Sequence, residues 1–267
     1  MNFKDASALG ILALGAAAIW LRDRRWATDA GDVLPSLAGF PLMIWLGAPW
    51  RLQANTAGFH GPTLALAGVI GVAGIATNLT LLMAAAWTAA LWSWLRPRLA
   101  PDQRRRGAQL LVLPFVAFPW IALDLQPLGW WFRLTGAQAT ASLFEVLGFD
   151  VARQGTELMV QGMPVEVTAA CAGMNALQSM LIAGAFLAYV LLGNSSVYFW
   201  NLALLFPLAW LANTVRIVVL TAAAVTWGQE FAMGAFHSWG GVLVLVAMFL
   251  ASWAAFQWQA HRLAGPP

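Results

Sequence analysis

Three side chains in the second half of this 267-residue chain have types that could do covalent chemistry together: Cys171, Arg216 and His237. The thiolate form of cysteine is the nucleophile, and a nearby cation or histidine lowers the pKa of its thiol. A histidine can activate the thiol and later protonate a leaving amine. An arginine can stabilise the oxyanion of a tetrahedral intermediate. The three residues together predict acyl transfer through a cysteine nucleophile.

Cys171 is the only cysteine, and it follows a short alternating stretch that includes Glu166. A long apolar segment begins at the cysteine. At helical spacing Thr168, Cys171, Asn175 and Gln178 fall at i, i+3, i+7 and i+10, which predicts one polar face on an otherwise apolar helix. The alternative interpretation is that Cys171 is a small buried hydrophobic residue.

Arg216 is the only charged residue between Tyr198 and Trp227. A charge at membrane depth costs about 2.5–3.5 kcal/mol, so such residues normally face a protein interior or water. Asn213 precedes Arg216 by three residues and is expected on the same helix face. The alternative is an arginine whose head reaches the lipid headgroups.

His237 opens the last apolar segment, before two glycines that permit close helix packing. A structural role is the alternative for His237. His60 and His261 lack comparable surroundings, and both are predicted to be structural.

The composition requires a polytopic membrane protein. The chain is 61% hydrophobic and 9% charged, whereas soluble domains carry about 25% charged residues. With one cysteine and one histidine in its membrane half, it offers no metal-ligand set. It also contains no nucleotide fingerprint and no serine-hydrolase elbow. We therefore predict no metal, no cofactor and no nucleic-acid partner.

The apolar segments predict an all-α fold with about seven or eight transmembrane or re-entrant helices in one domain, residues 1–267. Segment 63–95 is too long for one span, so it is either one span with an interfacial piece or a tight hairpin broken near Asn78. Segment 218–227 is about half a bilayer long, which favours a re-entrant half-helix. The predicted segments are 6–21, 34–50, 63–95, 109–125, 171–192, 198–212, 218–227 and 239–258.

Arginines predict the orientation. Segment 96–106 holds five arginines and one acid, the strongest cytoplasmic marker in the chain. Residues 22–25 are predicted as a second cytoplasmic flank. The acid-rich segment 126–170 is predicted on the other side, with a helix at 128–147 ended by Gly148. A small β-hairpin, 151–159 and 163–168, is expected around Gln161 and Gly162.

The chain resembles the exosortase/archaeosortase family of membrane-embedded cysteine transpeptidases. Glu166-Val167 followed by Ala170-Cys171-Ala172-Gly173 resembles the cysteine motif of the family, although Ala172 stands where the family often has serine. Asn213-Thr214-Val215-Arg216-Ile217 resembles its N-x-x-R-I motif, and Phe236-His237 resembles its histidine position. The likeness covers about residues 111–258, so we assign 107–258 as a catalytic core and 1–106 as N-terminal spans.

The resemblance implies that Cys171 is the nucleophile, Arg216 the oxyanion or thiolate partner, and His237 the acid/base. Asn175, Asn213 and Glu166 are expected to bind substrate or support the site. The implied substrates are exported proteins with a C-terminal sorting tail: a motif such as Pro-Glu-Pro, a transmembrane helix and a basic end. The tail would pack laterally in lipid at the extracytoplasmic face of the inner membrane, and the product would pass to an unknown acceptor.

Two other functions fit the same residues. One is a non-enzymatic transporter or assembly factor, in which Arg216 binds an anion and Cys171 is structural. The other is a family member that cleaves without transferring its product, and the sequence does not separate it from a transpeptidase.

Overall fold

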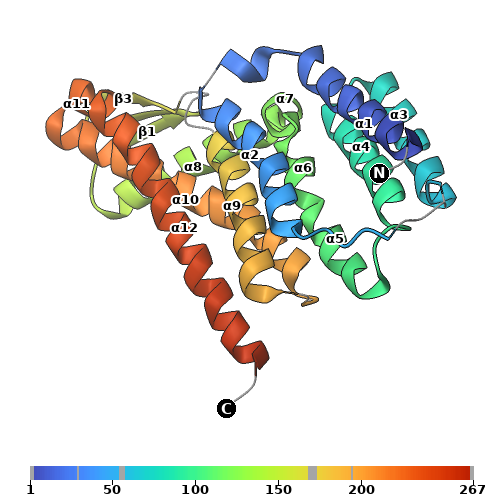
Figure 1. The fold of residues 1–267 in the computed structure, drawn as a ribbon. Helices are drawn as coiled ribbons and strands as arrows, with labels where there is room; N and C mark the ends of the chain where they lie inside the picture. The colour runs from blue at the N-terminus through green and yellow to red at the C-terminus, as the bar shows by residue number, and fades with distance from the viewer. Residues whose placement is uncertain (1–2, 29, 54–57, 168–172, 194, 265–267) are drawn as a thin grey trace. The chain divides into compact units, whose positions relative to one another are not determined.

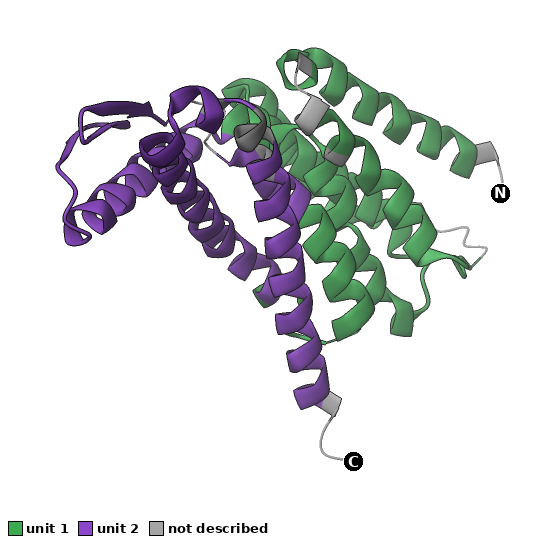
Figure 2. Ribbon diagram, turned by 90° about the vertical axis from the view of Figure 1, so that its left-hand side faces the viewer, with its two compact units in different colours: residues 1–124, 181–200 green, residues 125–180, 201–267 purple. Residues whose placement is uncertain are grey.

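A computed structural model describes residues 3–28, 30–53, 58–167, 173–193 and 195–264, and these are mostly helical (Figure 1). The chain forms two compact units (Figure 2). Unit 1 comprises residues 1–124 and 181–200, and unit 2 comprises residues 125–180 and 201–267. The helical membrane fold is confirmed, while the proposed division at residue 106 stays a prediction.

Unit 1 is built on an antiparallel helix pair, α3 (Gly61–Thr77) and α4 (Thr80–Leu95). Asn78 adopts a left-handed conformation with φ 61°, which ends α3 and reverses the chain within two residues. Of the two alternatives for segment 63–95, the tight hairpin is therefore the one observed. Gly74 lies where an added Cβ would come within 3.0 Å of the Met83 backbone nitrogen, so the pair packs closely.

Helix α1 (Phe3–Arg22) has its two ends fixed by polar contacts to opposite ends of α4. Near its start, Asp5 forms an ion pair of 2.7 Å with Arg98, which follows α4. At its end, Arg22 donates to the carbonyl of Asn78, just before α4. Residues 22–25 and the arginines of 96–106 therefore lie at opposite ends of unit 1. A helix of 20 residues separates the two groups, and the prediction that both are cytoplasmic stays a prediction.

Prolines break the predicted 109–125 span into short helices. Helix α6 (Val112–Ala117) ends before Pro119, and α7 (Trp120–Asp124) follows it. At the end of α7, the Asp124 carboxylate accepts a 2.5 Å hydrogen bond from the Leu81 backbone amide at the start of α4. The remaining helices of this part of unit 1 are η1 (Arg25–Thr28), α2 (Ala30–Gly47), η2 (Pro101–Gln103) and α5 (Arg104–Leu110).

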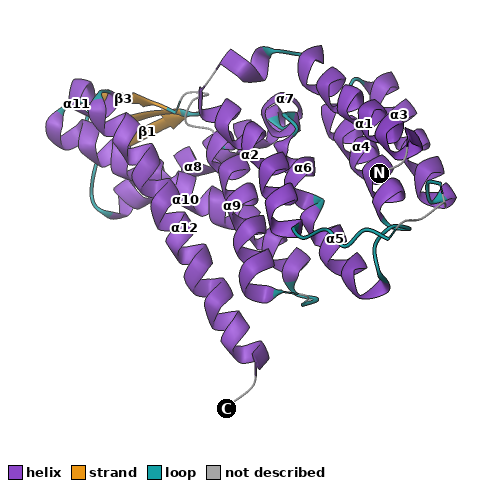
Figure 3. Cartoon of the chain, in the orientation of Figure 1, coloured by secondary structure: helices purple, strands orange, loops and turns teal. Residues whose placement is uncertain are grey.

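Unit 2 begins with α8 (Gln126–Val146), which ends at the predicted place: Gly148 has φ 86°. Three antiparallel strands follow, drawn in orange in Figure 3: β1 (Val151–Gln154), β2 (Glu157–Val160) and β3 (Met163–Glu166). Gln161 and Gly162 both have positive φ, as the tight turn of a hairpin requires. The predicted two-strand hairpin is extended by a second turn at Gly155, giving a three-stranded meander.

Helix α9 (Met174–Leu192) starts later than expected. Gly173 has φ 73°, and its carbonyl accepts the first helical bond from Leu177 at 2.9 Å. A left-handed residue cannot lie inside an α-helix, so the predicted helix face from Thr168 through Gln178 is wrong as a continuous face. Gln178 is buried in α9, whereas Thr168 and Cys171 lie outside the described residues.

Helix α10 (Tyr198–Trp227) is one continuous helix of 30 residues. The predicted break into a span and a re-entrant half-helix is therefore wrong. Pro207 lies inside the helix without ending it. The chain continues through α11 (Gln229–Met233), where a loop was expected, into α12 (Ala235–Ala264).

Among the described residues, three helices are long and apolar enough to cross a membrane: Asp5–Arg22, Tyr198–Trp227 and Val242–Leu263. Shorter apolar helices occur at Ser36–Gly47, Gly61–Thr77, Thr80–Leu95 and Ala176–Leu192. These lengths agree with a helical membrane protein and leave the predicted number of spans a prediction.

Candidate active site

Arg216 lies inside α10, roughly 27 Å along the helix from Tyr198 by the rise per residue. Its side chain is partly buried, and Asn213, one turn earlier, is buried. The next residue, Ile217, is also buried. The expectation that Asn213 and Arg216 share a helix face is therefore consistent with one unbroken helix.

Helix α8 packs against this part of α10. The Trp210 indole donates to the Thr135 hydroxyl at 2.8 Å. A Cβ added to Gly136 would come within 2.7 Å of the Ile217 Cδ1. The two helices are thus in direct contact at the turns that carry the N-x-x-R-I residues, which fixes those turns within unit 2.

Gly173 packs against Asn213 just before α9 begins. A Cβ at Gly173 would lie 2.9 Å from the Asn213 Oδ1 and 3.0 Å from its Cγ. The left-handed φ of 73° also favours glycine at this position. The backbone two residues after Cys171 therefore lies directly against the Asn213 side chain.

Arg133, on α8, contacts the chain just before the cysteine segment. Its guanidinium donates to the Val167 carbonyl at 3.5 Å, and the Val167 amide donates to the Thr156 carbonyl at 3.1 Å. Val167 is the last described residue before the gap at 168–172. Arg133 could not be selected from the sequence, because its contact is with a backbone atom distant in the chain.

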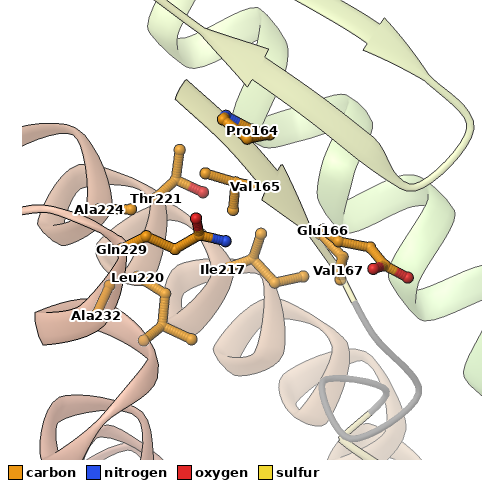
Figure 4. A pocket seen from close by; sticks show the side chains of 10 residues that line it. All are labelled: Pro164, Val165, Glu166, Val167, Ile217, Leu220, Thr221, Ala224, Gln229 and Ala232. Atoms are coloured by element: carbon orange, nitrogen blue, oxygen red, sulfur yellow. The ribbon is translucent and has the colours of Figure 1, made fainter. Parts of the chain in front are cut away.

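Glu166 ends β3 with an exposed side chain, directly opposite Glu157 in the register. In Figure 4 its carboxylate points away from Val165, Thr221 and Gln229. Like charges directly opposite on a sheet repel one another. A supporting role for Glu166 stays a prediction.

Of the predicted triad Cys171, Arg216 and His237, only the Arg216 side chain lies among the described residues. Cys171 lies outside the described residues, as do the side chains of Asn175 on α9 and His237 on α12. The backbone of His237 is helical, in the third position of α12. Near the far end of α12, Gln259 exchanges two amide hydrogen bonds with Asn201, at 2.8 and 2.9 Å. Since Asn201 is near the start of α10, α12 returns along α10, and His237 lies in the half nearer the Trp227 end.

His60 and His261, the two histidines predicted to be structural, are distant in the chain from Cys171 and Arg216. In unit 1, the His60 Nδ1 lies 2.8 Å from the Thr63 hydroxyl, and the His60 Nε2 lies 3.2 Å from an Arg96 nitrogen. Since Arg96 can only donate, Nε2 accepts and the Nδ1 proton points to Thr63. His261 lies in the last turn of α12. Among the described residues, no group of three or more histidines, cysteines or acids could hold a metal.

A cavity of about 120 Å³ opens beside β3, within unit 2 (Figure 4). One wall is β3 itself with Val167, and the other is formed by α10 and α11. Thr221 and Gln229 are its polar side chains; Glu166 also lines it, with its carboxylate directed away, and the remaining lining is apolar. The cavity therefore adjoins the strand that leads directly to the cysteine segment.

A family model for transmembrane exosortases matches residues 2–254. The chain belongs to this family. The match includes all six predicted site residues, and it extends the likeness from residues 111–258 to nearly the whole chain. Exosortase membership thus includes the N-terminal spans, which had matched only as generic membrane segments. No curated protein and no solved structure matches the chain.

Proposed function

We propose that this exosortase-family member is a membrane cysteine protease and transpeptidase that cleaves C-terminal sorting tails of exported proteins. The observation that carries the proposal is the contact of Gly173 with Asn213. Cys171 precedes Gly173 by two residues, and two residues of chain reach at most about 7 Å. Arg216 lies one helical turn beyond Asn213, roughly 4.5 Å along the axis. This spacing supports a site in which the thiol and the guanidinium act on one reacting carbonyl.

The chemistry requires an activated thiol and a stabilised oxyanion. The Cys171 sulfur attacks the carbonyl carbon of the scissile peptide, and Arg216 stabilises the charge that develops on the oxygen. The carbon–nitrogen bond then breaks, and the leaving nitrogen takes the proton that His237 received from the thiol. A thioester on Cys171 remains. An acceptor amine attacks it in transpeptidation, or water in hydrolysis, and the thiol is restored.

The arginine pattern supports an extracytoplasmic site. The turn after α9 packs on Gln109: the Ser195 carbonyl accepts from the Gln109 amide at 3.5 Å, and the Tyr198 hydroxyl donates to the Gln109 carbonyl at 3.0 Å. Gln109 follows Arg104–Arg106 in α5 and so belongs to the arginine-rich end of unit 1. We propose that the Cys171 end of α9, a helix of 19 residues, lies at the extracytoplasmic face.

The test is the processing of a candidate sorting-tail protein from the same genome, followed as a size shift on a gel. We expect the wild type to shorten the substrate and a Cys171→Ala variant to leave it intact, at equal amounts of folded enzyme. If both forms shorten the substrate, Cys171 is not the nucleophile and the proposal fails. If the wild type leaves every candidate sorting-tail protein of that genome intact, a non-enzymatic membrane protein with a structural Cys171 is favoured instead.

A further inference from the structure

The strand β3 forms one edge of the unit 2 sheet, because the described strands have the order β1-β2-β3. In the register with β2, Met163 pairs with Val160 across the two-residue turn, and Pro164 pairs with Met159. Hydrogen-bonded and non-hydrogen-bonded pairs alternate in an antiparallel ladder, and a two-residue turn is closed by a hydrogen-bonded pair. The backbone groups of Pro164 and Glu166 are therefore directed to the outer edge.

This arrangement also explains the proline. Proline has no amide proton, so within a sheet it is found where its nitrogen faces outward from an edge. The outer edge of β3 consequently offers the Glu166 amide as a donor and the Pro164 and Glu166 carbonyls as acceptors. The cavity lies along this strand, since Pro164, Val165, Glu166 and Val167 all line it.

A buried hydroxyl on the opposite wall points to a ligand. Thr221, on α10, has no exposed surface, and its Oγ1 has no hydrogen-bond partner among the described residues. A helical threonine can bond to the carbonyl four residues earlier, as Thr214 does to Trp210 at 2.9 Å. Thr221 does not do this. Figure 4 shows its hydroxyl directed towards Val165, and the Gln229 amide extending from α11 towards the same space.

We propose that the cavity beside β3 binds an extended segment of the polypeptide substrate, which pairs with the outer edge of β3 as an added strand. One apolar side chain of the segment fills the cavity, and a polar atom of its backbone bonds to the Thr221 hydroxyl. Addition of a strand supplies binding through main-chain bonds, while a pocket for a side chain supplies specificity. This inference rests on the proposed function and names its substrate-recognition surface.

The occupant is a polypeptide because the unpaired groups on both walls require donors and acceptors. A lipid acyl chain could fill the apolar part of the cavity but has neither donors nor acceptors.

The position of the cavity in the chain agrees with a role in substrate binding. Cys171 follows Val167 by four residues, a reach of at most about 14 Å. A segment on β3 is thus within a few residues of the bond that Cys171 would attack.

Photocrosslinking in the native host tests the occupant. Benzoylphenylalanine replaces Gln229, which is exposed and lines the cavity, in the full-length Cys171→Ala protein. The matched control carries it at the next residue, Glu230, which is exposed and does not line the cavity. We expect an adduct at position 229 alone with an exported protein, mapped by mass spectrometry to the stretch preceding its C-terminal membrane helix.

Three results would overturn the inference: an adduct with lipid only, no adduct at position 229, or equal capture of the same protein at position 230. None of these depends on whether Cys171 is the nucleophile, because the variant lacks the thiol. Conversely, processing by Cys171→Ala would contradict the proposed function, whereas a crosslink at position 229 would still support the binding surface.

The hydroxyl has its own test with the captured protein as substrate. Thr221→Val keeps the shape of the side chain and removes its hydrogen bond, so KM should rise about threefold to tenfold while kcat is retained. Thr221→Ser should restore KM. Val219→Leu, on the exposed face of the same helix, is the control. An unchanged KM in Thr221→Val would show that the hydroxyl does not contact the substrate.

Discussion

The two units use their polar residues differently. In unit 1 the described polar groups mostly connect helices to one another: Arg98 to Asp5, Arg22 to Asn78, Arg96 to His60 and Asp124 to the Leu81 amide. In unit 2, Arg133 and Asn213 contact the backbone on either side of residues 168–172, and Thr221 faces a cavity. Membrane-buried polar groups are costly. Those of unit 1 stabilise the fold, whereas Arg133 and Asn213 of unit 2 contact residues that flank the Cys171 segment in the chain.

The largest difference between the units is expected from the variants Arg216→Ala and Arg98→Ala, the first in processing and the second in stability. Arg216→Ala should reduce processing about a hundred- to a thousandfold, the usual loss when one oxyanion donor is removed. Arg98→Ala should instead leave the Asp5 carboxylate without its 2.7 Å partner and lower the free energy of unfolding by roughly 3 kcal/mol.

Processing per folded molecule and thermal unfolding in detergent measure the two effects. His60→Ala is the mild reference for processing. Equal losses of processing in His60→Ala and Arg216→Ala would contradict the assignment of Arg216 to the site.

The glycines give a second, smaller comparison. Gly173→Ala places a Cβ 2.9 Å from the Asn213 Oδ1 at a φ of 73°. We expect about 1–2 kcal/mol of destabilisation and at least about a tenfold loss of kcat, because the cysteine segment must shift.

Gly68→Ala is the matched control in unit 1. Gly68 lies in α3 with nothing within 4 Å of an added Cβ. Alanine is the better helix former, so this variant should be about 0.5–1 kcal/mol more stable and equally active. Full activity in Gly173→Ala would show that the contact with Asn213 does not position the nucleophile.

The local features of both units were predictable from sequence. Asn78 and Gly162 occur where the chain must adopt positive φ, and their residue types favour this conformation. Gln161 also has positive φ, as the first residue of the same two-residue turn. Gly148 ends α8 for the same reason. Each of these predictions depends only on residues adjacent in the chain.

The continuity of α10 was not predictable by the same means. A ten-residue apolar segment after Arg216 suggested a half-helix, but the membrane does not limit a helix of 30 residues that extends beyond it. Arg133 and the late start of α9 depend on contacts between α8, α10 and the strands. Such contacts leave no periodic signal in the sequence, because one partner is a backbone carbonyl or a glycine.

Arg133 provides a test of intermediate size. Arg133→Met keeps the apolar stem and removes the donor to the Val167 carbonyl, so kcat/KM should fall about tenfold with little change in Tm. Arg133→Lys should recover part of the loss, since it restores a cationic donor. Arg96→Met, which removes the contact with His60 in unit 1, should leave kcat/KM unchanged. A loss in Arg96→Met equal to that in Arg133→Met would remove the distinction between the units.

The smallest effect is expected at the exposed end of unit 1. A hydrogen bond from Arg25 lowers the pKa of the Asp23 carboxyl from 3.8 to about 2. A carboxyl with a depressed pKa stabilises the folded state above its unfolded pKa, and this contribution is lost as the pH falls from about 4 towards 2. Because the Arg25 side chain is 81% exposed, solvent screens the pair. Asp23→Asn should therefore leave Tm and processing at pH 7 unchanged. A clear fall in Tm would mean that the Asp23–Arg25 pair stabilises unit 1 about as much as the buried Asp5–Arg98 pair does.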